Sequence, residues 1–318
     1  MPLGSVLEVL QSPQWDGARY WYNVRMLSTG LEGWASEFFL APSEVAAAPI
    51  LFVSDEAGSQ DIYQINPDGT GRMRLTSAPG DEADPSWSPD RRHIVFAYRA
   101  QGDTDLYIMD ANGGGWQQIA DLAGEEVHPV WSPDGGRIAF VSNMDGDWEI
   151  YLLDLNTRQV RQLTFNNAWD SFPSWSPDGT QLVFTSQQTG NYDLFLLDVA
   201  SGQQTQLTTS PYSDAHGTWS PQGNDIVYTM VWEEGGKLTR GVGMLNVSNP
   251  TQPWRVTFGD ISTLGFRYPD WSPDGRFIIF VAGEAPWFEL YAASSRGTTA
   301  VKLTSATSRS SIAPTWSR

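Results

Sequence analysis

The sequence predicts an all-β fold, a six-bladed β-propeller of four-stranded blades, and three observations lead to it. The first is a repeat, because the dipeptide Trp-Ser recurs six times at intervals of 44, 44, 44, 52 and 45 residues. The second is a turn signature after most of these dipeptides, and the third is the order of strands at the two chain ends. A period of about 45 residues is typical of propeller blades. The repeated tryptophans are Trp87, Trp131, Trp175, Trp219, Trp271 and Trp316.

Each Trp-Ser is expected to end the first strand of a blade and to lead into a tight turn. Four of the six continue as Trp-Ser-Pro-Asp, and Gly follows in three of these. Pro presets φ, Asp bonds nearby backbone and Gly accepts a positive φ, so the segment reverses the chain. Apolar runs such as 138–141 and 149–153 follow, and a last segment ends in Leu-Thr, as at Leu163-Thr164. These runs predict the second, third and fourth strands.

The chain ends indicate how the ring closes. The first repeat begins at Ile50 with what is already a second strand, and the last Trp-Ser, at Trp316, has no second strand after it. Pairing the strand of Trp316 with the strand of Ile50 completes one blade and leaves no open sheet edge. The propeller domain is therefore predicted to span residues 50–318.

Residues 1–42 follow a different pattern. The segments 4–10, 20–25 and 32–40 alternate apolar and polar residues between turn residues, which predicts a small antiparallel barrel. Residues 43–49, rich in Ala with a Pro, are expected to be a short linker.

Composition removes several classes of function. The chain has 37 Asp and Glu against 19 Lys and Arg, a net charge of −18, so it would repel a nucleic-acid backbone. No stretch has the length of a membrane helix, and the first residues lack the pattern of a secretory leader. There is no cysteine, which excludes disulfides and thiolate chemistry. We expect neither nucleic-acid binding nor membrane insertion.

Alignment on the tryptophans predicts a partner-binding site at one mouth of the central channel. The loop before each first strand lies at that mouth, so equivalent positions of the blades form rings. Four blades carry an acid five residues before Trp, and two carry His three residues before it. The predicted site residues are Glu82, Asp84, Glu126, His128, Asp170, Asp214, His216, Arg267 and Tyr268.

The acids five residues before Trp, on four successive blades, form an acidic arc, and three interpretations of it are open. The acids cap turns and aid solubility, or they bind a basic or polar peptide or a cation, or they support a metal-centred enzyme. For the third, His128 and His216 are the candidate ligands of a divalent cation, although the channel is expected to separate them. No Gly-x-Ser-x-Gly elbow is present, so no catalytic residue and no other cofactor is predicted.

The Trp-Ser-Pro-Asp-Gly repeat resembles the bacterial TolB-type propeller repeat, also called the WD40-like or PD40 repeat. The segment from Trp21 to Val24 and the Gly33-Trp34 pair resemble the latter half of a bacterial SH3-like domain. The resemblance implies that the front half of this barrel is missing, so that either the start is truncated or the module is degenerate and leans on the propeller. The resemblance implies a non-enzymatic protein-binding or scaffolding module of a bacterial cell-envelope assembly, in the periplasm or at the cell surface. The SH3-like part implies a cell-wall glycan or peptide as a second partner. Related repeats also include lyases of acidic sugars, so a metal-dependent enzyme acting on acidic glycans at the mouth is the alternative.

Overall fold

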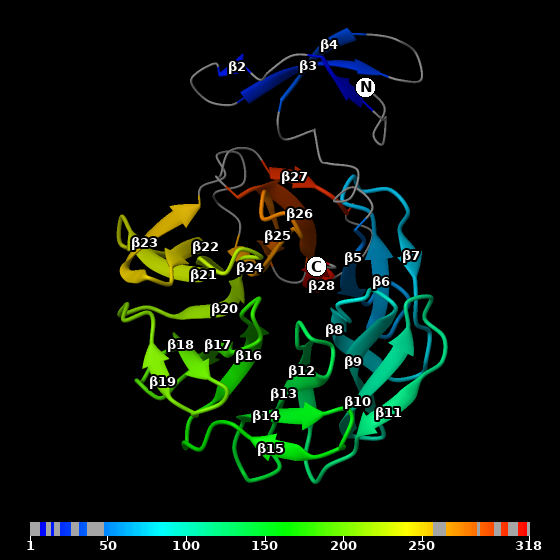
Figure 1. Ribbon diagram of the computed structural model, residues 1–318, viewed down its shortest axis with the longest axis vertical. Coiled ribbons are helices and arrows are strands. Elements are labelled where there is room, and N and C mark those ends of the chain that lie inside the picture. Colours follow the sequence, from blue (N-terminus) through cyan, green and yellow to red (C-terminus); the bar gives the residue numbers. More distant parts are fainter. Residues whose placement is uncertain are drawn as a thin grey trace.

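The structure is a computed structural model that describes residues 7–10, 14–15, 20–26, 32–36, 48–256, 265–284, 287–295, 300–304 and 311–316. Six four-stranded antiparallel sheets are arranged as blades around a central channel, and the first strand of each lies nearest the centre (Figure 1). All regular elements of the described residues are strands. The predicted six-bladed propeller is confirmed.

The blades are numbered here in chain order, and in each the strands follow one another in space. Blade 1 comprises β28 (Ser311–Trp316), β5 (Ile50–Ser54), β6 (Asp61–Ile65) and β7 (Met73–Arg74). Blade 2 comprises β8 (Asp81–Trp87), β9 (His93–Ala100), β10 (Asp103–Asp110) and β11 (Gln117–Ala120). Blade 3 comprises β12 (Glu126–Trp131), β13 (Arg137–Ser142), β14 (Glu149–Asp154) and β15 (Val160–Gln162).

The second half of the ring repeats this order with one longer hairpin. Blade 4 comprises β16 (Asp170–Trp175), β17 (Gln181–Ser186), β18 (Asp193–Asp198) and β19 (Gln204–Gln206). Blade 5 comprises β20 (Asp214–Trp219), β21 (Asp225–Glu234), β22 (Lys237–Asn246) and β23 (Asn249–Val256). Blade 6 comprises β24 (Gly265–Trp271), β25 (Phe277–Glu284), β26 (Trp287–Ser294) and β27 (Ala300–Lys302).

The core lies between neighbouring blades. The second strands are its centre, and β5 is buried along its whole length. One cluster joins Ala139 and Val141 of blade 3 to Trp175 and Phe184 of blade 4. Trp175 is 4% exposed and donates its indole N–H to the carbonyl of Val130, 3.3 Å away. The repeat tryptophan thus joins one blade to the preceding one, since burying so large a side chain stabilises the interface.

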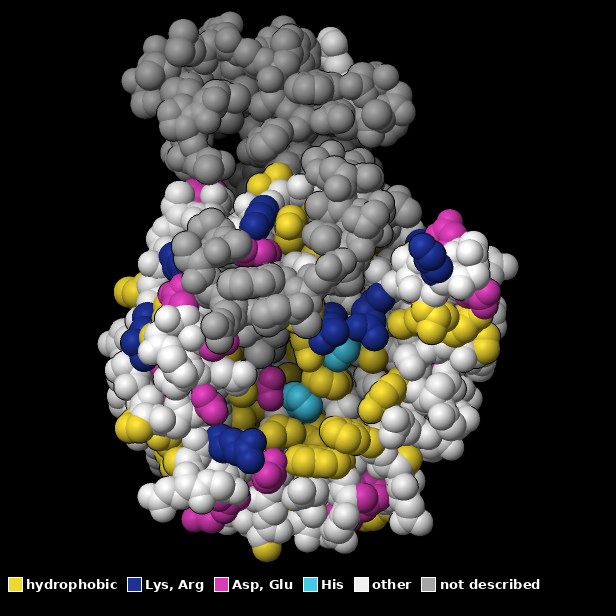
Figure 2. All heavy atoms as spheres, turned by 180° about the vertical axis from the view of Figure 1, so that it is seen from behind, with side chains coloured by type: hydrophobic (Ala, Val, Ile, Leu, Met, Phe, Trp, Pro, Cys, Tyr) yellow, Lys and Arg dark blue, Asp and Glu magenta, His cyan; other side chains and the backbone are white. Residues whose placement is uncertain are grey.

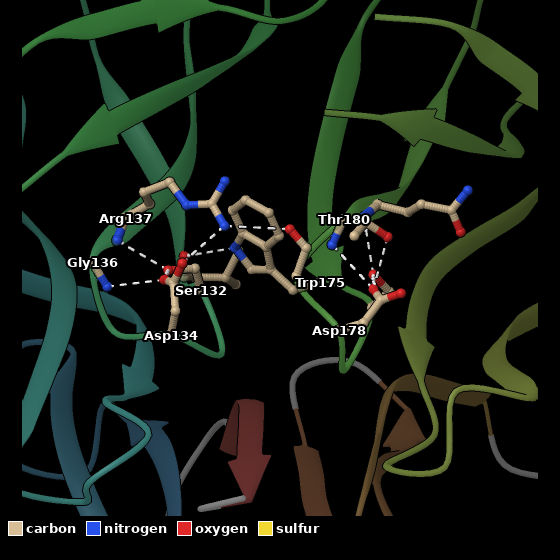
Figure 3. A network of polar contacts seen from close by, with 11 residues as sticks. Ser132, Asp134, Gly136, Arg137, Trp175, Asp178 and Thr180 are labelled. Atoms are coloured by element: carbon tan, nitrogen blue, oxygen red, sulfur yellow. Dashed lines mark hydrogen bonds and ion pairs between the residues drawn. The ribbon is translucent and has the colours of Figure 1, made fainter. Parts of the chain in front are cut away.

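The Ser-Pro-Asp turns are held by a hydrogen-bond network that explains the motif. In blade 4, Ser176 Oγ donates to Asp178 over 2.6 Å and accepts the backbone N–H of Gln181 over 3.0 Å. The hydrogen bond from Ser176, with others in the turn, lowers the pKa of Asp178. Figure 3 shows the equivalent turn of blade 3, where Arg137 also reaches the carbonyl of Gly179 in blade 4. The Ser-Pro-Asp motif is therefore structural in blades 2, 3, 4 and 6, the four that carry it.

The predicted seam is confirmed. In blade 1, β28 pairs with β5 so that Trp316 lies opposite Ile50 and Thr315 opposite Leu51. Trp316 is 3% exposed, and its indole N–H donates to the carbonyl of Ala48 over 3.0 Å. Both ends of the propeller sequence therefore contribute to one blade, and the sheet has no unpaired edge at the closure.

Four short strands precede the propeller: β1 (Leu7–Val9), β2 (Gln14–Trp15), β3 (Tyr20–Met26) and β4 (Glu32–Ser36). Strand β3 pairs antiparallel with the other three. This sheet agrees with the expected strands, but it does not establish an SH3-like barrel, and most of the linker at 43–49 lies outside the described residues. In the part of the chain described, no helix has the length and hydropathy of a membrane span.

Candidate functional site

The residues three positions before the repeat tryptophans share an unusual backbone conformation. Asp84, His128, Phe172, His216 and Tyr268 have φ values of 50–57°. Each stands where its first strand shifts register against the second, at a β-bulge. A bulky residue in this left-handed region costs of order 1–3 kcal/mol and tends to occur at functional sites. We call these five residues the ring.

The ring side chains contact one another around the channel. The centroid of Phe172 lies 4.0 Å from that of His128 and 4.3 Å from that of His216. His216 in turn lies 4.3 Å from Tyr268. Figure 2 shows two His side chains near each other in a hollow at the centre of one face. The two His side chains are therefore not on opposite sides of an open channel, as the sequence had led us to expect, because Phe172 bridges them.

A cavity of about 460 Å³ runs along the channel from the ring. Its far end is lined by the prolines of the Ser-Pro turns, among them Pro89, Pro133 and Pro177. We call that end the turn mouth, and the end beyond the ring, where the first strands begin, the loop mouth. Prolines and aromatic rings are rigid and bring little entropy cost to a contact surface.

The four acids placed five residues before Trp do not line the mouth. Glu82, Glu126, Asp170 and Asp214 are 0–1% exposed and lie between blades. The reason is the bulge, because one extra residue changes which face of the strand a side chain occupies. The structure thus brings together Asp84, His128, His216 and Tyr268, with Arg267 beside Tyr268 in the same strand, and places the four acids elsewhere.

Each buried acid meets a second carboxyl from the preceding blade. Glu82 accepts a hydrogen bond from Thr76 Oγ1 over 2.7 Å, and Thr76 Oγ1 accepts the backbone N–H of Ile62 over 2.8 Å. The Thr of a Leu-Thr ending therefore orients the buried acid in three of the four cases, Glu82, Asp170 and Asp214. The four carboxyl pairs are Asp61 with Glu82, Asp105 with Glu126, Glu149 with Asp170, and Asp193 with Asp214.

Burial raises the pKa of these carboxyl groups. It is the main cause that raises the pKa of Glu82, Glu126 and Asp214 to about 7. Burial, with the charge of Asp170, raises the pKa of Glu149 to about 8. Because a buried unpaired carboxylate is costly, these groups are partly protonated at neutral pH, and they contribute less negative charge than exposed acids would.

The two ring histidines are neutral for the same reason. Burial lowers the pKa of His216 to about 3, and the charges of His128, Arg240 and Arg267 add to this shift. Burial also lowers the pKa of His128, although Asp84 opposes the shift from 3.6 Å. His216 Nδ1 and Thr229 Oγ1 share a hydrogen bond of 3.1 Å. The ring therefore offers neutral imidazoles and aromatic rings, with Asp84 as its acid.

A metal centre requires several converging ligands. Across the described residues, no three His, Asp or Glu side chains come together in a way that would hold a metal ion. His128 has Asp84 beside it, and His216 has Thr229. The two histidines do not form a three-ligand group with the acids predicted for that role.

The family assignment follows from the repeat and is supported by comparison with known proteins. The TolB beta propeller domain matches residues 115–318. The chain belongs to the TolB β-propeller family. A TolB homolog of Chlorobium chlorochromatii is 31% identical over 96 residues, which are 29% of this chain and 22% of that protein. The Tol-Pal system protein TolB of Nitratidesulfovibrio vulgaris is 36% identical over 44 residues, 14% of this chain and 10% of that protein. The chain thus aligns with less than a quarter of either relative.

Solved structures share the TolB propeller fold. TolB from Acinetobacter baumannii has a TM-score of 0.72 at 21% identity, covering 96% of this chain and 81% of that one. An oligogalacturonate lyase in complex with manganese has a TM-score of 0.57 at 17% identity, covering 86% of this chain and 82% of that one. At these sequence identities the similarity shows the fold alone, and a shared fold does not imply a shared function.

Two residues of the mouth were not among the predicted site residues. Phe172 occupies the ring position of blade 4, and the alignment on Trp175 contains the signal for it. Arg240 lies in the longer hairpin of blade 5 and acts on the charge of both His216 and Tyr268. The signal for Arg240 is the interval of 52 residues, but a repeat gives no register for residues that only one blade has.

Proposed function

We propose that this chain is a non-enzymatic protein-binding module of a bacterial cell-envelope assembly, working outside the cytoplasm and docking a partner at the loop mouth. The observation that carries the proposal is the ring. Five residues on five blades are held in a strained conformation at one level of the channel, where they form a partly exposed aromatic and imidazole floor. Strain of this kind persists where the surrounding fold imposes it, and it clusters at binding sites.

Relatives support the cellular setting. Both are TolB proteins, and one is named as part of the Tol-Pal system. An envelope location and a protein partner therefore belong to this proposal. Its finer parts are that residues 50–318 carry the docking site and that residues 1–42 form an SH3-like part for cell-wall glycan or peptide, joined by the linker 43–49.

The surface chemistry of the ring fits protein recognition. Aromatic rings that are anchored in a rigid scaffold give large contact area at low entropy cost. Phe172, His216 and Tyr268 are such groups, because each is packed against the others. Asp84 adds a polar contact at the edge of the ring.

A crosslinking pair tests the docking site. The photoreactive analogue p-benzoylphenylalanine replaces Phe172 in the ring, and in a matched protein it replaces Phe165, which is 75% exposed and does not line the cavity. Irradiation of cells that express each protein should give a discrete protein adduct from position 172 and none, or different ones, from position 165. Identical adducts from both positions, or no adduct from position 172, would refute docking at the ring.

A further inference from the structure

Blades 5 and 6 depart from the repeat twice, and both departures place an arginine beside the ring. The interval from Trp219 to Trp271 is 52 residues where the preceding ones are 44, and four of the eight extra residues lengthen the β21–β22 hairpin, which carries Arg240. Arg267 stands four residues before Trp271. The other blades have small or apolar residues at that position, namely Ala83, Val127, Ser171, Ala215 and Ile312.

The two guanidinium groups lie close to each other and to the ring. Arg240 is exposed in its hairpin, yet partial burial of its guanidinium and the charge of Arg267 lower its pKa, and both arginines lower the pKa of His216. The guanidinium of Arg267 lies over the ring of Phe288, 4.9 Å from its centroid, which fixes the side chain. Figure 2 shows basic side chains next to a histidine in the central hollow.

Neither arginine is neutralised by the part of the protein that the structure describes. No ion pair joins Arg240 or Arg267 to a described Asp or Glu. Arg267 Nε is buried and has no hydrogen-bond partner among those residues. A buried guanidinium donor without an acceptor carries a desolvation cost that an incoming oxygen anion would recover.

The interface of blades 5 and 6 also lacks the buried acids that are found at other interfaces of the propeller. At the interface of blades 5 and 6, Gly241 and Phe266 take the places that a carboxyl pair occupies at four other interfaces. Phe266 is 4% exposed and packs on Phe280, 5.3 Å away. This interface therefore has two arginines beside the ring and none of the buried carboxyl pairs of the other four.

We infer that Arg240 and Arg267, beside His216 and Tyr268, bind a carboxylate of an acidic segment of the partner protein. The inference rests on the proposed function, because it uses the same mouth and adds the charge of the ligand. It reverses the charge that the sequence suggested for the ligand, since the four acids expected at the mouth are buried. The planar fork of Arg matches the two oxygens of a carboxylate, so two arginines select an anion over a cation.

Fluorescence anisotropy at low salt tests the inference with three labelled probes: a hexaglutamate peptide, a hexalysine peptide and a trigalacturonate. The full chain is compared with Arg240→Gln, Arg267→Gln and Arg158→Gln. Arg158 is a matched control, because it is exposed in the turn between β14 and β15, at the opposite end of the strands. Melting temperatures of all variants confirm folding.

Hexaglutamate should bind more tightly than hexalysine. Each mouth variant should weaken its binding by about fivefold or more, as expected for a lost charge-assisted hydrogen bond, and Arg158→Gln should leave it unchanged. Tighter binding of hexalysine, or equal binding by all variants, would overturn the anion site and leave docking at the ring standing. Tighter binding of trigalacturonate than of hexaglutamate would overturn the protein ligand. Absence of binding by every probe would overturn the inference, while the crosslink from position 172 decides separately whether the ring docks a partner.

Discussion

The interface between blades 3 and 4 and the interface between blades 5 and 6 use the same tryptophan in different surroundings. Trp175 and Trp271 are 4% and 3% exposed, and each donates its indole N–H to a carbonyl of the preceding blade. Beyond the tryptophan the interfaces diverge. Blades 3 and 4 bury the acids Glu149 and Asp170, whereas blades 5 and 6 bury Phe266 and carry the longer hairpin.

The difference between the two interfaces separates residues that close the propeller from residues that the propeller offers to a ligand. Features that recur around the propeller, such as the tryptophan of all six blades and the Ser-Pro turn of five, are explained by closure of the propeller. Features that one sector alone has, Arg240 and Arg267, are not needed for closure and lie at the mouth. Binding chemistry is therefore expected where the repeat is broken.

The largest effect on stability should come from the tryptophans. Trp175→Ala and Trp271→Ala should each cost about 3–5 kcal/mol, because each leaves a cavity between blades, which corresponds to a fall of about 5–10 °C in melting temperature. Calorimetry of both variants measures this. If Trp271→Ala cost less than half of what Trp175→Ala costs, the two interfaces would not share one closing role.

The pH dependence of stability should come from the regular interfaces. The pKa of Glu149 is about 8 in the folded chain and near 4.5 when unfolded, so the stability that its protonated form gives is lost as pH rises through 8. With the other buried acids, the melting temperature should fall by about 5 °C between about pH 6.5 and 8.5. The histidines counteract this little above about pH 7, because an unfolded His, with an ordinary pKa near 6.5, is then mostly neutral, as His216 is in the folded chain.

A neutral amide isolates this effect. Glu149→Gln keeps an acceptor for the backbone N–H of Asn166 and removes the titrating group, so its melting temperature should depend less on pH. Glu234→Gln, on the exposed end of the blade 5 hairpin, is the control and should keep the slope of the original protein. Equal slopes in all three proteins would show that the buried acids do not titrate with folding.

A smaller loss is expected at the turns. Ser176→Ala removes the hydroxyl that donates to Asp178 and accepts from the backbone of Gln181, and should cost about 1–2 kcal/mol. The equivalent change in blade 6, Ser272→Ala, removes the same pair of bonds and should cost the same amount. Urea denaturation compares them, and a difference above about 1 kcal/mol would contradict a shared structural role for the motif.

The smallest effect should come from metal. Addition of Mn²⁺ or of a chelator should shift the melting temperature by less than about 1 °C, because a bound ion stabilises only where ligands converge. Metal analysis of the purified chain is the second measurement. Stoichiometric metal that is lost in His128→Ala and His216→Ala would instead favour the metal-dependent glycan enzyme over the binding module.

Much of the fold could be predicted because local chemistry and the repeat agree. The turns follow from Ser-Pro-Asp-Gly, and the seam follows from the order of Ile50 and Trp316 along the chain. The ring was also predictable, since Asp84, His128 and Tyr268 hold one position relative to Trp. The burial of Glu82 was not predictable, because the bulge at Asp84 shifts the alternation of faces and leaves no clear mark in the sequence.

One variant tests directly whether the broken repeat serves binding rather than closure. Residues 231–240 are replaced by an Asn-Gly turn, which removes eight residues net and leaves the two hairpin strands of blade 5 six residues long, as in blade 4. The melting temperature and the affinity for hexaglutamate are measured together. The account predicts a melting temperature within about 3 °C of the original chain and a loss of at least about fivefold in affinity. Unchanged affinity for hexaglutamate, or a propeller that no longer folds, would contradict the account.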